Sequence, residues 1–419
     1  MKYQKRNGSV QIINARVPGY EGLQRVAIAP DRTLQSIRPM SDIATSDHSV
    51  SDHSISEIEN PAETIDVEGD WISPGGIDLQ INGGLGLAFP DLDPNNPNNP
   101  VLLRKISEYL WDQGIDGFLP TIVTSSITQI HQSLETLSNI VAKSKIQNPK
   151  SKIPSVAMPD RAINPKSKIL GVHLEGPFLN PTKRGAHPEE HLLPLTLEQV
   201  KRVLGDYASI VNVITLAPEL EEGTGEVIAY LRSLGITVSL GHSLATAAQA
   251  QQAFDQGATM VTHAFNAMPG LHHREPGLLG AALTHPVVAA GFIADGEHVC
   301  PTMLDLVLRV NSNLFLVSDA LAPLGLPDGI YPWDTREIQV TAGTARLLDG
   351  TLSGTTLPLL DGVKNLVKWG LCDVEQAIAL ATIAPRRAIG MPVWGTGEPV
   401  HLLRWTHDQD SQSLRWQRL

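Results

Sequence analysis

The chain has 419 residues, of which 42% are hydrophobic and 18% charged, so it can bury the core of one large domain and a small one. Its formal net charge of -12 gives no general attraction for nucleic acid or an anionic membrane surface, and we expect neither as a partner. With only Cys300 and Cys372, neither a disulfide framework nor a thiolate zinc site is expected. The first residues, MKYQKRNGSV, lack an apolar targeting segment and no run of about 18 apolar residues follows, which predicts a cytoplasmic protein.

Residues 1–73 contain short apolar runs, at 10–13, 26–29 and 64–67, separated by Gly, Pro and Asp. This pattern predicts a few β-strands rather than a helical domain. A Ser/Asp/His-rich stretch begins at Ser41 and includes His48 and His53. We predict a solvated loop there, because no apolar frame would hold the two histidines around a metal.

From Pro74 to residue 390, apolar runs alternate with helical patterns, such as those at 101–110, 197–203, 225–234 and 244–254. This alternation predicts a closed (β/α)8 TIM-type barrel. An open doubly wound sheet is the alternative, but no glycine fingerprint for a dinucleotide follows the first strand. The eight candidate strands begin near Gly76, Gly117, Ile169, Val211, Thr237, Thr259, Val288 and Leu314.

Two segments stand outside this alternation. The string NPKSKI occurs twice after Ile146, in a polar stretch that we predict to be a surface loop. After two amphipathic helices at 357–369 and 374–389, residues 391–419 read as strands again. Neither chain end can bury a core alone, so we expect residues 1–73 and 391–419 to pair into one small β-sandwich domain beside the barrel.

Polar residues suited to catalysis directly follow the apolar runs, and the exits of parallel barrel strands gather at one face. Glu175, His242 and His263 offer one carboxylate and two imidazoles, which are enough to hold a catalytic divalent metal and leave one position for water. Asp319 follows the last strand and is suited to accept the proton of that water and deliver it to a leaving group. The other exits carry Glu219 and the pair Asp295 and His298.

Each of these residues also has an ordinary structural interpretation. Alone, Glu175 fits a solvated loop, His242 and His263 fit core histidines, and Asp319 fits a helix cap. Only their joint occurrence favours a metal site. Arg274, in HHREPG, fits either a phosphate or carboxylate contact or a salt bridge with Glu275. The stretch DGTLSGTT at 349–356 leads into a helix and fits a backbone cradle for an anion.

Between roughly Trp71 and Gly390 the chain contains, in this order, the motifs PGGIDLQINGG, GVHLEGPFLN, GAHPE, TLAPE, GHS, THAFNAMPGLHHREPG, ADGEHV, LVSDALAP, DGTLSGTTLPLLDGVKNLV and ATIAPRRAIG. Taken together, these motifs resemble those of the N-acetylglucosamine-6-phosphate deacetylases of the amidohydrolase superfamily. The resemblance implies hydrolysis of N-acetylglucosamine 6-phosphate to glucosamine 6-phosphate and acetate in amino sugar catabolism or recycling. It implies that metal-activated water attacks the acetamide carbonyl.

The same resemblance implies residue roles. The metal ligands would be Glu175, His242 and His263, with Asp319 as general base and acid, and His187 would lie near the acetyl carbonyl. In this family, Arg274 would grip the phosphate across the interface of a homodimer. The remaining expected substrate contacts are Ala186, Asn266, Ala267, Asp295, His298, Leu352, Ser353 and Gly354.

Gln80 and Asn82 stand where many superfamily members carry His-X-His for a second metal. We therefore expect one divalent ion per subunit, with Zn²⁺ as the first choice and Fe²⁺, Co²⁺ or Mn²⁺ as alternatives. Three alternative functions are deacetylation of N-acetylgalactosamine 6-phosphate, deacetylation of an N-acetyl amino acid, and a non-catalytic regulator that binds a sugar phosphate. The retained ligands and Asp319 argue against the regulator. The sequence leaves open the epimer, the native metal, the choice between a homodimer and a higher homo-oligomer, and the subunit that Arg274 serves.

Overall fold

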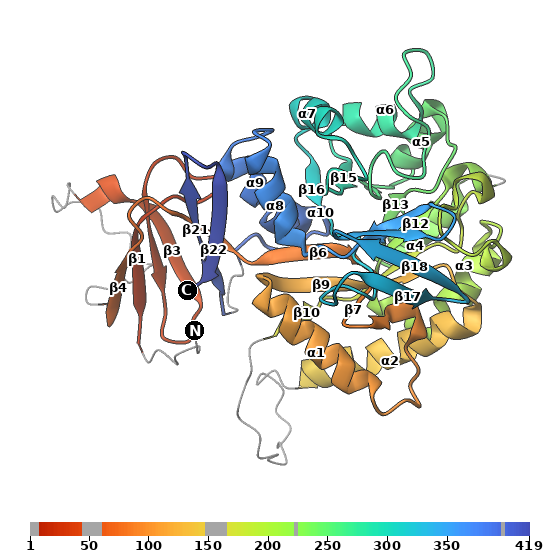
Figure 1. Cartoon of the computed structure of the whole chain (residues 1–419), viewed down its shortest axis with the longest axis horizontal. Helices are drawn as coiled ribbons and strands as arrows, with labels where there is room; N and C mark the ends of the chain where they lie inside the picture. Colours follow the sequence, from red (N-terminus) through yellow and green to blue (C-terminus); the bar gives the residue numbers. More distant parts are fainter. Residues whose placement is uncertain (1–7, 44–60, 147–165, 222–224, 395–398) are drawn as a thin grey trace.

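The computed structural model describes residues 8–43, 61–146, 166–221, 225–394 and 399–419. A barrel surrounded by helices lies beside a small β domain, and both chain ends lie in that small domain (Figure 1). The predicted loop with His48 and His53, and most of the predicted loop after Ile146, lie outside the described residues. Within the described part of the chain, no helix is long and apolar enough to cross a membrane.

The barrel consists of eight parallel strands in sequence order, each paired with the next, which confirms the predicted TIM-type fold. A short strand, β10 (Lys168–Ile169), also pairs with the second barrel strand. The first and last barrel strands meet through a bridge between Ile81 and Ala320 and a hydrogen bond of 2.9 Å from Asp319 N to Gln80 O. The barrel strands are β6 (Gly76–Ile81), β9 (Ile115–Val123), β11 (Val172–Glu175), β12 (Val211–Leu216), β13 (Thr237–Leu240), β14 (Met260–Val261), β15 (Ala289–Phe292) and β16 (Leu314–Leu316).

Helices follow the predicted patterns closely, and local chemistry sets their ends. For example, α5 begins at Ala247 because Thr246 forms a capping box with Gln249. The predicted helix at 374–389 is instead two helices, with Pro385 in the first turn of the second, where its missing N–H costs nothing. The helices are α1 (Asn99–Asp112), α2 (Ile127–Ile146), α3 (Leu197–Leu204), α4 (Glu226–Ser233), α5 (Ala247–Asp255), α6 (Gly277–Thr284), α7 (Pro301–Val310), α8 (Leu359–Lys368), α9 (Val374–Thr382) and α10 (Ala384–Ala388).

The small domain is built from both chain ends, as predicted. One sheet has the order β3-β2-β1-β4 and the other the order β22-β21-β5, and apolar side chains from both sheets form one core. Its exact limits at 73/74 and 390/391 stay a prediction. The strands are β1 (Val10–Ala15), β2 (Gln24–Ile28), β3 (Leu34–Pro39), β4 (Glu63–Asp66), β5 (Trp71–Pro74), β21 (Leu402–Asp408) and β22 (Ser413–Arg418).

A largely buried cluster of charged side chains joins the small domain to the barrel at the start of β9. The carboxylate of Asp116 pairs with Arg418 of β22 at 3.0 Å and with Arg386 of α10 at 3.2 Å. The Arg418 guanidinium also lies 3.5 Å from the ring centroid of Trp111. This junction is at the amino-terminal end of β9, on the side of the barrel opposite to the strand exits that carry the candidate catalytic residues.

A four-stranded antiparallel sheet between β16 and α8 was not predicted. It consists of β17 (Gly329–Trp333), β18 (Arg336–Thr341), β19 (Thr344–Leu347) and β20 (Leu352–Thr355). Its apolar face forms a core with Ala186 and Leu321, which follow β11 and β16. The residues expected to cradle an anion ahead of a helix, Leu352, Ser353 and Gly354, thus belong to a strand, and α8 begins only at Leu359.

Candidate active site

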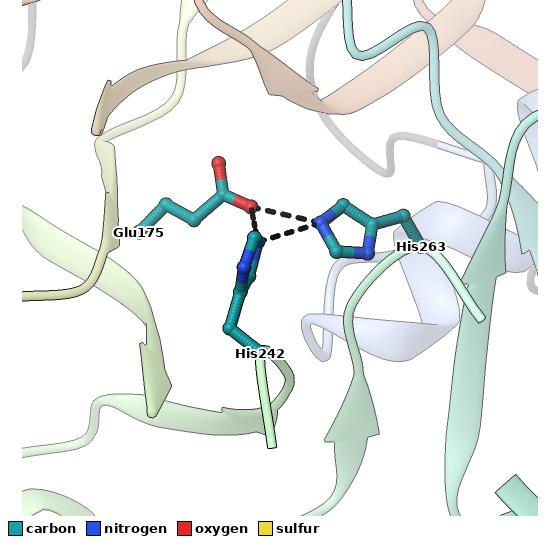
Figure 2. A group of neighbouring side chains, drawn as sticks. All are labelled: Glu175, His242 and His263. Carbon is teal, nitrogen blue, oxygen red and sulfur yellow. Dashed lines mark hydrogen bonds and ion pairs between the residues drawn. The ribbon is translucent and has the colours of Figure 1, made fainter. Parts of the chain in front are cut away.

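Three side chains converge at the carboxyl ends of β11, β13 and β14. In Figure 2, Glu175, His242 and His263 point toward one another from three separate segments. Oε1 of Glu175 lies 3.3 Å from Nε2 of His242 and 3.1 Å from Nε2 of His263, and the two Nε2 atoms are 3.0 Å apart. All three side chains are buried.

These distances fit a divalent metal. A tetrahedral ion with bonds of about 2.0–2.1 Å separates neighbouring ligand atoms by roughly 3.3–3.4 Å, close to the separations in this cluster. Burial alone raises the pKa of Glu175, but hydrogen bonds to His242 and His263 hold it well below its usual range. A carboxylate that stays ionised beside two imidazole nitrogens is a suitable ligand set for Zn²⁺ and related ions.

Backbone geometry and a carbonyl orient the histidines. Nδ1 of His242 lies 2.9 Å from the carbonyl oxygen of Lys183, which only accepts hydrogen bonds. A neutral His242 with its proton on Nδ1 would therefore have its Nε2 lone pair available to a metal ion, in place of the contact that Nε2 makes with Glu175. His242, His263 and Asp319 all have positive φ angles, of 49°, 27° and 48°. Such conformations are unfavourable for residues with a Cβ and occur often at functional sites.

Asp319 lies beside the three-residue cluster and is joined to it by amides. Its Oδ1 accepts hydrogen bonds from Nδ2 of Asn82 at 2.7 Å and from Nε2 of Gln80 at 3.2 Å. The same Gln80 amide lies 2.9 Å from Oε1 of Glu175. Burial, followed by the charge of Glu175, raises the pKa of Asp319 to about 7. Gln80 and Asn82 therefore use their N–H groups to orient carboxylates.

His187 contacts the cluster from the loop that follows β11. The backbone N–H of Thr124 donates to its Nδ1 over 3.3 Å, and Oγ1 of Thr124 lies 2.9 Å from the same atom. Both contacts are satisfied when the proton of the neutral ring is on Nε2. Its ring centroid is 4.5 Å from that of His242. Burial, followed by the electrostatic effect of the neighbouring His242 ring, lowers the pKa of His187 to about 3. His187 is therefore a neutral imidazole with a donor at Nε2.

A buried polar layer lies beneath the cluster inside the barrel. Nε2 of His173 is 2.7 Å from Oγ1 of Thr215, which is 2.6 Å from Oγ1 of Thr262, and Ser239 Oγ is 2.6 Å from that same Thr262 atom. Burial lowers the pKa of His173 to about 4. This neutral chain links β11, β12 and β13 to the residue before His263, so it holds the strand exits in register.

The other expected substrate residues that follow β14 and β15 are held in place by the following contacts. The side chains of Asp295 and His298 form a buried pair at 2.6 Å, and a protonated His298 would act to lower the pKa of Asp319. Asn266 donates to the carbonyl of His263 at 3.2 Å, and the carbonyl of Ala267 accepts from Ser243 N at 3.1 Å.

Arg274 is exposed in the segment between β14 and α6. In the described residues it has no ion pair with Glu275.

The sequence does not predict the residues that support the candidate catalytic side chains through hydrogen bonds. The sequence pattern identifies Glu219 only as a polar residue at the end of a strand. Its carboxylate accepts hydrogen bonds from Ser243 Oγ at 2.6 Å and Asn180 Nδ2 at 2.9 Å, which braces the loops on either side of His242. Lys183 acts through its backbone carbonyl, so its residue type does not signal its contribution. Thr124 contacts His187 through both its backbone N–H and its hydroxyl, and a single threonine is too common a residue to signal this role.

The Amidohydrolase family profile matches residues 71–396. The chain belongs to the amidohydrolase family. Its members are metal-dependent, in agreement with the buried Glu175, His242 and His263 cluster.

Individual relatives agree with this assignment. The chain is 38% identical over 340 residues to the N-acetylglucosamine-6-phosphate deacetylase of Caenorhabditis elegans, covering 78% of this chain and 76% of the relative. It is 32% identical over 332 residues to the N-acetylgalactosamine-6-phosphate deacetylase of Escherichia coli O157:H7, covering 79% and 81%. The crystal structure of the Pasteurella multocida N-acetylglucosamine-6-phosphate deacetylase superposes with a TM-score of 0.75 at 26% identity, covering 98% of this chain and 100% of that one. The resemblance inferred from the motifs is thus confirmed.

Proposed function

We propose that this amidohydrolase converts N-acetylglucosamine 6-phosphate and water to glucosamine 6-phosphate and acetate. The observation that carries the proposal is the convergence of Glu175, His242 and His263 beside the buried carboxyl of Asp319. The names of the relatives supply the substrate class. A phosphorylated sugar does not cross a membrane unaided, so we also infer that the protein acts in the cytoplasm.

Amide hydrolysis needs an electrophilic carbonyl, a base for water and an acid for the amine. A divalent ion held by Glu175, His242 and His263 would polarise the acetamide carbonyl and make water a better nucleophile near neutral pH. Asp319 would take the proton from the attacking water and return it to the departing amine nitrogen. Asn82 and Gln80 orient the Asp319 carboxylate with their N–H groups. The Nε2–H of neutral His187 would donate to the carbonyl oxygen as negative charge develops there.

We predict one tightly bound divalent ion per chain. Gln80 and Asn82 place amide groups beside Asp319, and their N–H groups already donate to Oδ1 of Asp319 and, from Gln80, to Oε1 of Glu175. Elemental analysis of the purified, active protein is expected to give one equivalent of zinc, iron, cobalt or manganese. Two equivalents per active chain would show that the amides do not exclude a second ion.

One panel of substrates tests both which N-acetylhexosamine epimer the protein prefers and whether hydrolysis requires the 6-phosphate. N-acetylgalactosamine 6-phosphate is the second candidate substrate, because the E. coli relative with that name covers as much of the chain as the C. elegans one. We expect the highest kcat/KM for N-acetylglucosamine 6-phosphate in a panel that contains both phosphorylated epimers, both free sugars and an N-acetyl amino acid. A preference for the galactosamine epimer would change the substrate assignment but not the reaction. Binding of sugar phosphate without acetate release would indicate the non-catalytic regulator.

A further inference from the structure

The tip of the β17–β18 hairpin contacts the loop that carries His187. Nη2 of Arg336 donates to the carbonyl oxygen of Ala186 at 2.6 Å. The carboxylate of Asp334 accepts from the backbone N–H of Arg336 at 2.9 Å and from its Nε at 3.0 Å. The guanidinium is therefore fixed in direction by its own turn before it reaches Ala186, which lowers the entropy lost in making the contact.

The loop from Lys183 to His187 contributes to the candidate site at both of its ends. The carbonyl of Lys183 orients His242, and the ring of His187 is held by Thr124. Within the loop, Gly185 has a φ of 58°, and a Cβ placed on it would lie 3.7 Å from Cε1 of His242. The Ala186 carbonyl lies between these two ends, and Arg336 of the inserted sheet donates to it.

The opposite edge of the same sheet is bonded to the segment that carries Asp319. The backbone N–H of Thr355 in β20 donates to the carbonyl of Asp319 at 3.1 Å, and the N–H of Leu321 donates to the carbonyl of Thr355 at 2.9 Å. A Cβ on Gly354 would lie 2.7 Å from the Asp319 carbonyl oxygen, so the close approach of β20 to the segment that carries Asp319 requires a glycine there. The sheet therefore bridges the Asp319 segment and the His187 loop, which lie far apart in the sequence.

We propose that Arg336, locked by Asp334, is a positioning residue that sets the place of Ala186 and His187 relative to Asp319. Its kinetic consequence rests on the proposed function, because His187 and Asp319 act on opposite sides of one acetamide group in that reaction. A displacement of about 1 Å in a group that contacts the reacting atoms is enough to lower a rate by about 10²-fold. Arg336 is about one-third exposed, so the loss of its contact should have a smaller effect than the loss of a buried one.

The kinetic test compares Arg336→Gln with the wild-type holoenzyme. We expect kcat/KM for the N-acetylhexosamine 6-phosphate to fall about tenfold with metal content unchanged, and Arg336→Lys to recover part of the loss. Combining Arg336→Gln with His187→Asn should add little to the loss caused by His187→Asn, because both changes remove one shared contribution. Arg309→Gln is the matched control. It also breaks an exposed pair, with Asp305 at 2.9 Å on α7, and should leave kcat/KM unchanged.

A second measurement does not depend on the reaction. Hydrogen exchange of the holoenzyme should show faster exchange at the amides of residues 184–187 in Arg336→Gln, and no change there in Arg309→Gln. Unchanged exchange would overturn the proposal, and so would faster exchange with unchanged kcat/KM or fully additive losses in the double variant. If Arg336→Gln fails to fold, Asp334→Asn releases the guanidinium with a smaller change and is judged by the same outcomes. If the wild type releases no acetate, the proposed function fails, while the exchange data still decide whether Arg336 holds the loop.

Discussion

Asp319→Asn is expected to lower kcat by about 10²–10⁴-fold while the metal content stays at the wild-type level. The asparagine keeps the size of the side chain and an oxygen that accepts from Gln80 and Asn82, but it cannot take a proton from water. Glu175, His242 and His263 are untouched, so the cluster should still bind its ion. Steady-state acetate release and elemental analysis on the same preparation test both statements.

A control variant and the pH dependence of kcat/KM make the test of Asp319 more specific. Asp305→Asn removes a carboxylate from the surface of α7 and should leave kcat unchanged. Because Asp319 must be ionised to act as base, kcat/KM should fall as the pH drops through its pKa. That pKa is about 7 without a cation, and a bound divalent ion would lower it. An Asp319→Asn variant that keeps most of its activity, with the same acid limb, would assign the base to another group.

Arg274→Ala is expected to lower kcat/KM for the phosphorylated sugar by about 10²-fold, and to lower that for the free sugar much less. A protein with a net charge of -12 needs a dedicated cation to hold a phosphate dianion. A charge-assisted hydrogen bond contributes roughly 1.5–3 kcal/mol, and a bidentate pair contributes more. Arg274→Lys should recover only part of the loss, because an ammonium cannot form the two-pronged contact. Equal losses for both sugars would contradict the phosphate role.

Arg274 is exposed in a single chain, which agrees with a role at the active site of a second copy in a homodimer. If Arg274 of the partner subunit completes each site, mixing Arg274→Ala with Asp319→Asn should restore activity in hybrid dimers. One of the two sites in such a hybrid would combine an intact Asp319 with an intact arginine. No restoration, with subunit exchange verified, would assign Arg274 to the site of its own chain.

The barrel and the metal cluster were predictable because their signals are local. The barrel strands are short, largely buried and mostly rich in apolar residues. Glu175 is the last residue of β11, and His242, His263 and Asp319 follow their strands within three residues. Once parallel strands are assumed, topology brings their exits together. The small sandwich was predictable for a similar reason, since neither chain end could bury its apolar face alone.

The inserted sheet and the supports of the site were not predictable in this way. The strands β17 to β20 are short and lie at the surface, and their burial depends on Ala186 and Leu321 from distant parts of the chain. The contact of Lys183 with His242 is made by a backbone carbonyl, which every residue type offers, and Thr124 reaches His187 from a distant strand exit through its N–H and its hydroxyl. The break between α9 and α10 is subtler still, because Pro385 in a first helical turn fits either a new helix or a continuing one.

The central claim is that a metal-dependent amide hydrolysis takes place at Glu175, His242, His263 and Asp319. The most direct test is to incubate the purified holoenzyme with N-acetylglucosamine 6-phosphate and to quantify both products. The proposed function predicts acetate and glucosamine 6-phosphate in equal amounts, at a rate that falls on metal removal and falls by about 10²-fold or more in Asp319→Asn. No acetate from either phosphorylated epimer, after loading with zinc, iron, cobalt or manganese in turn, would contradict it.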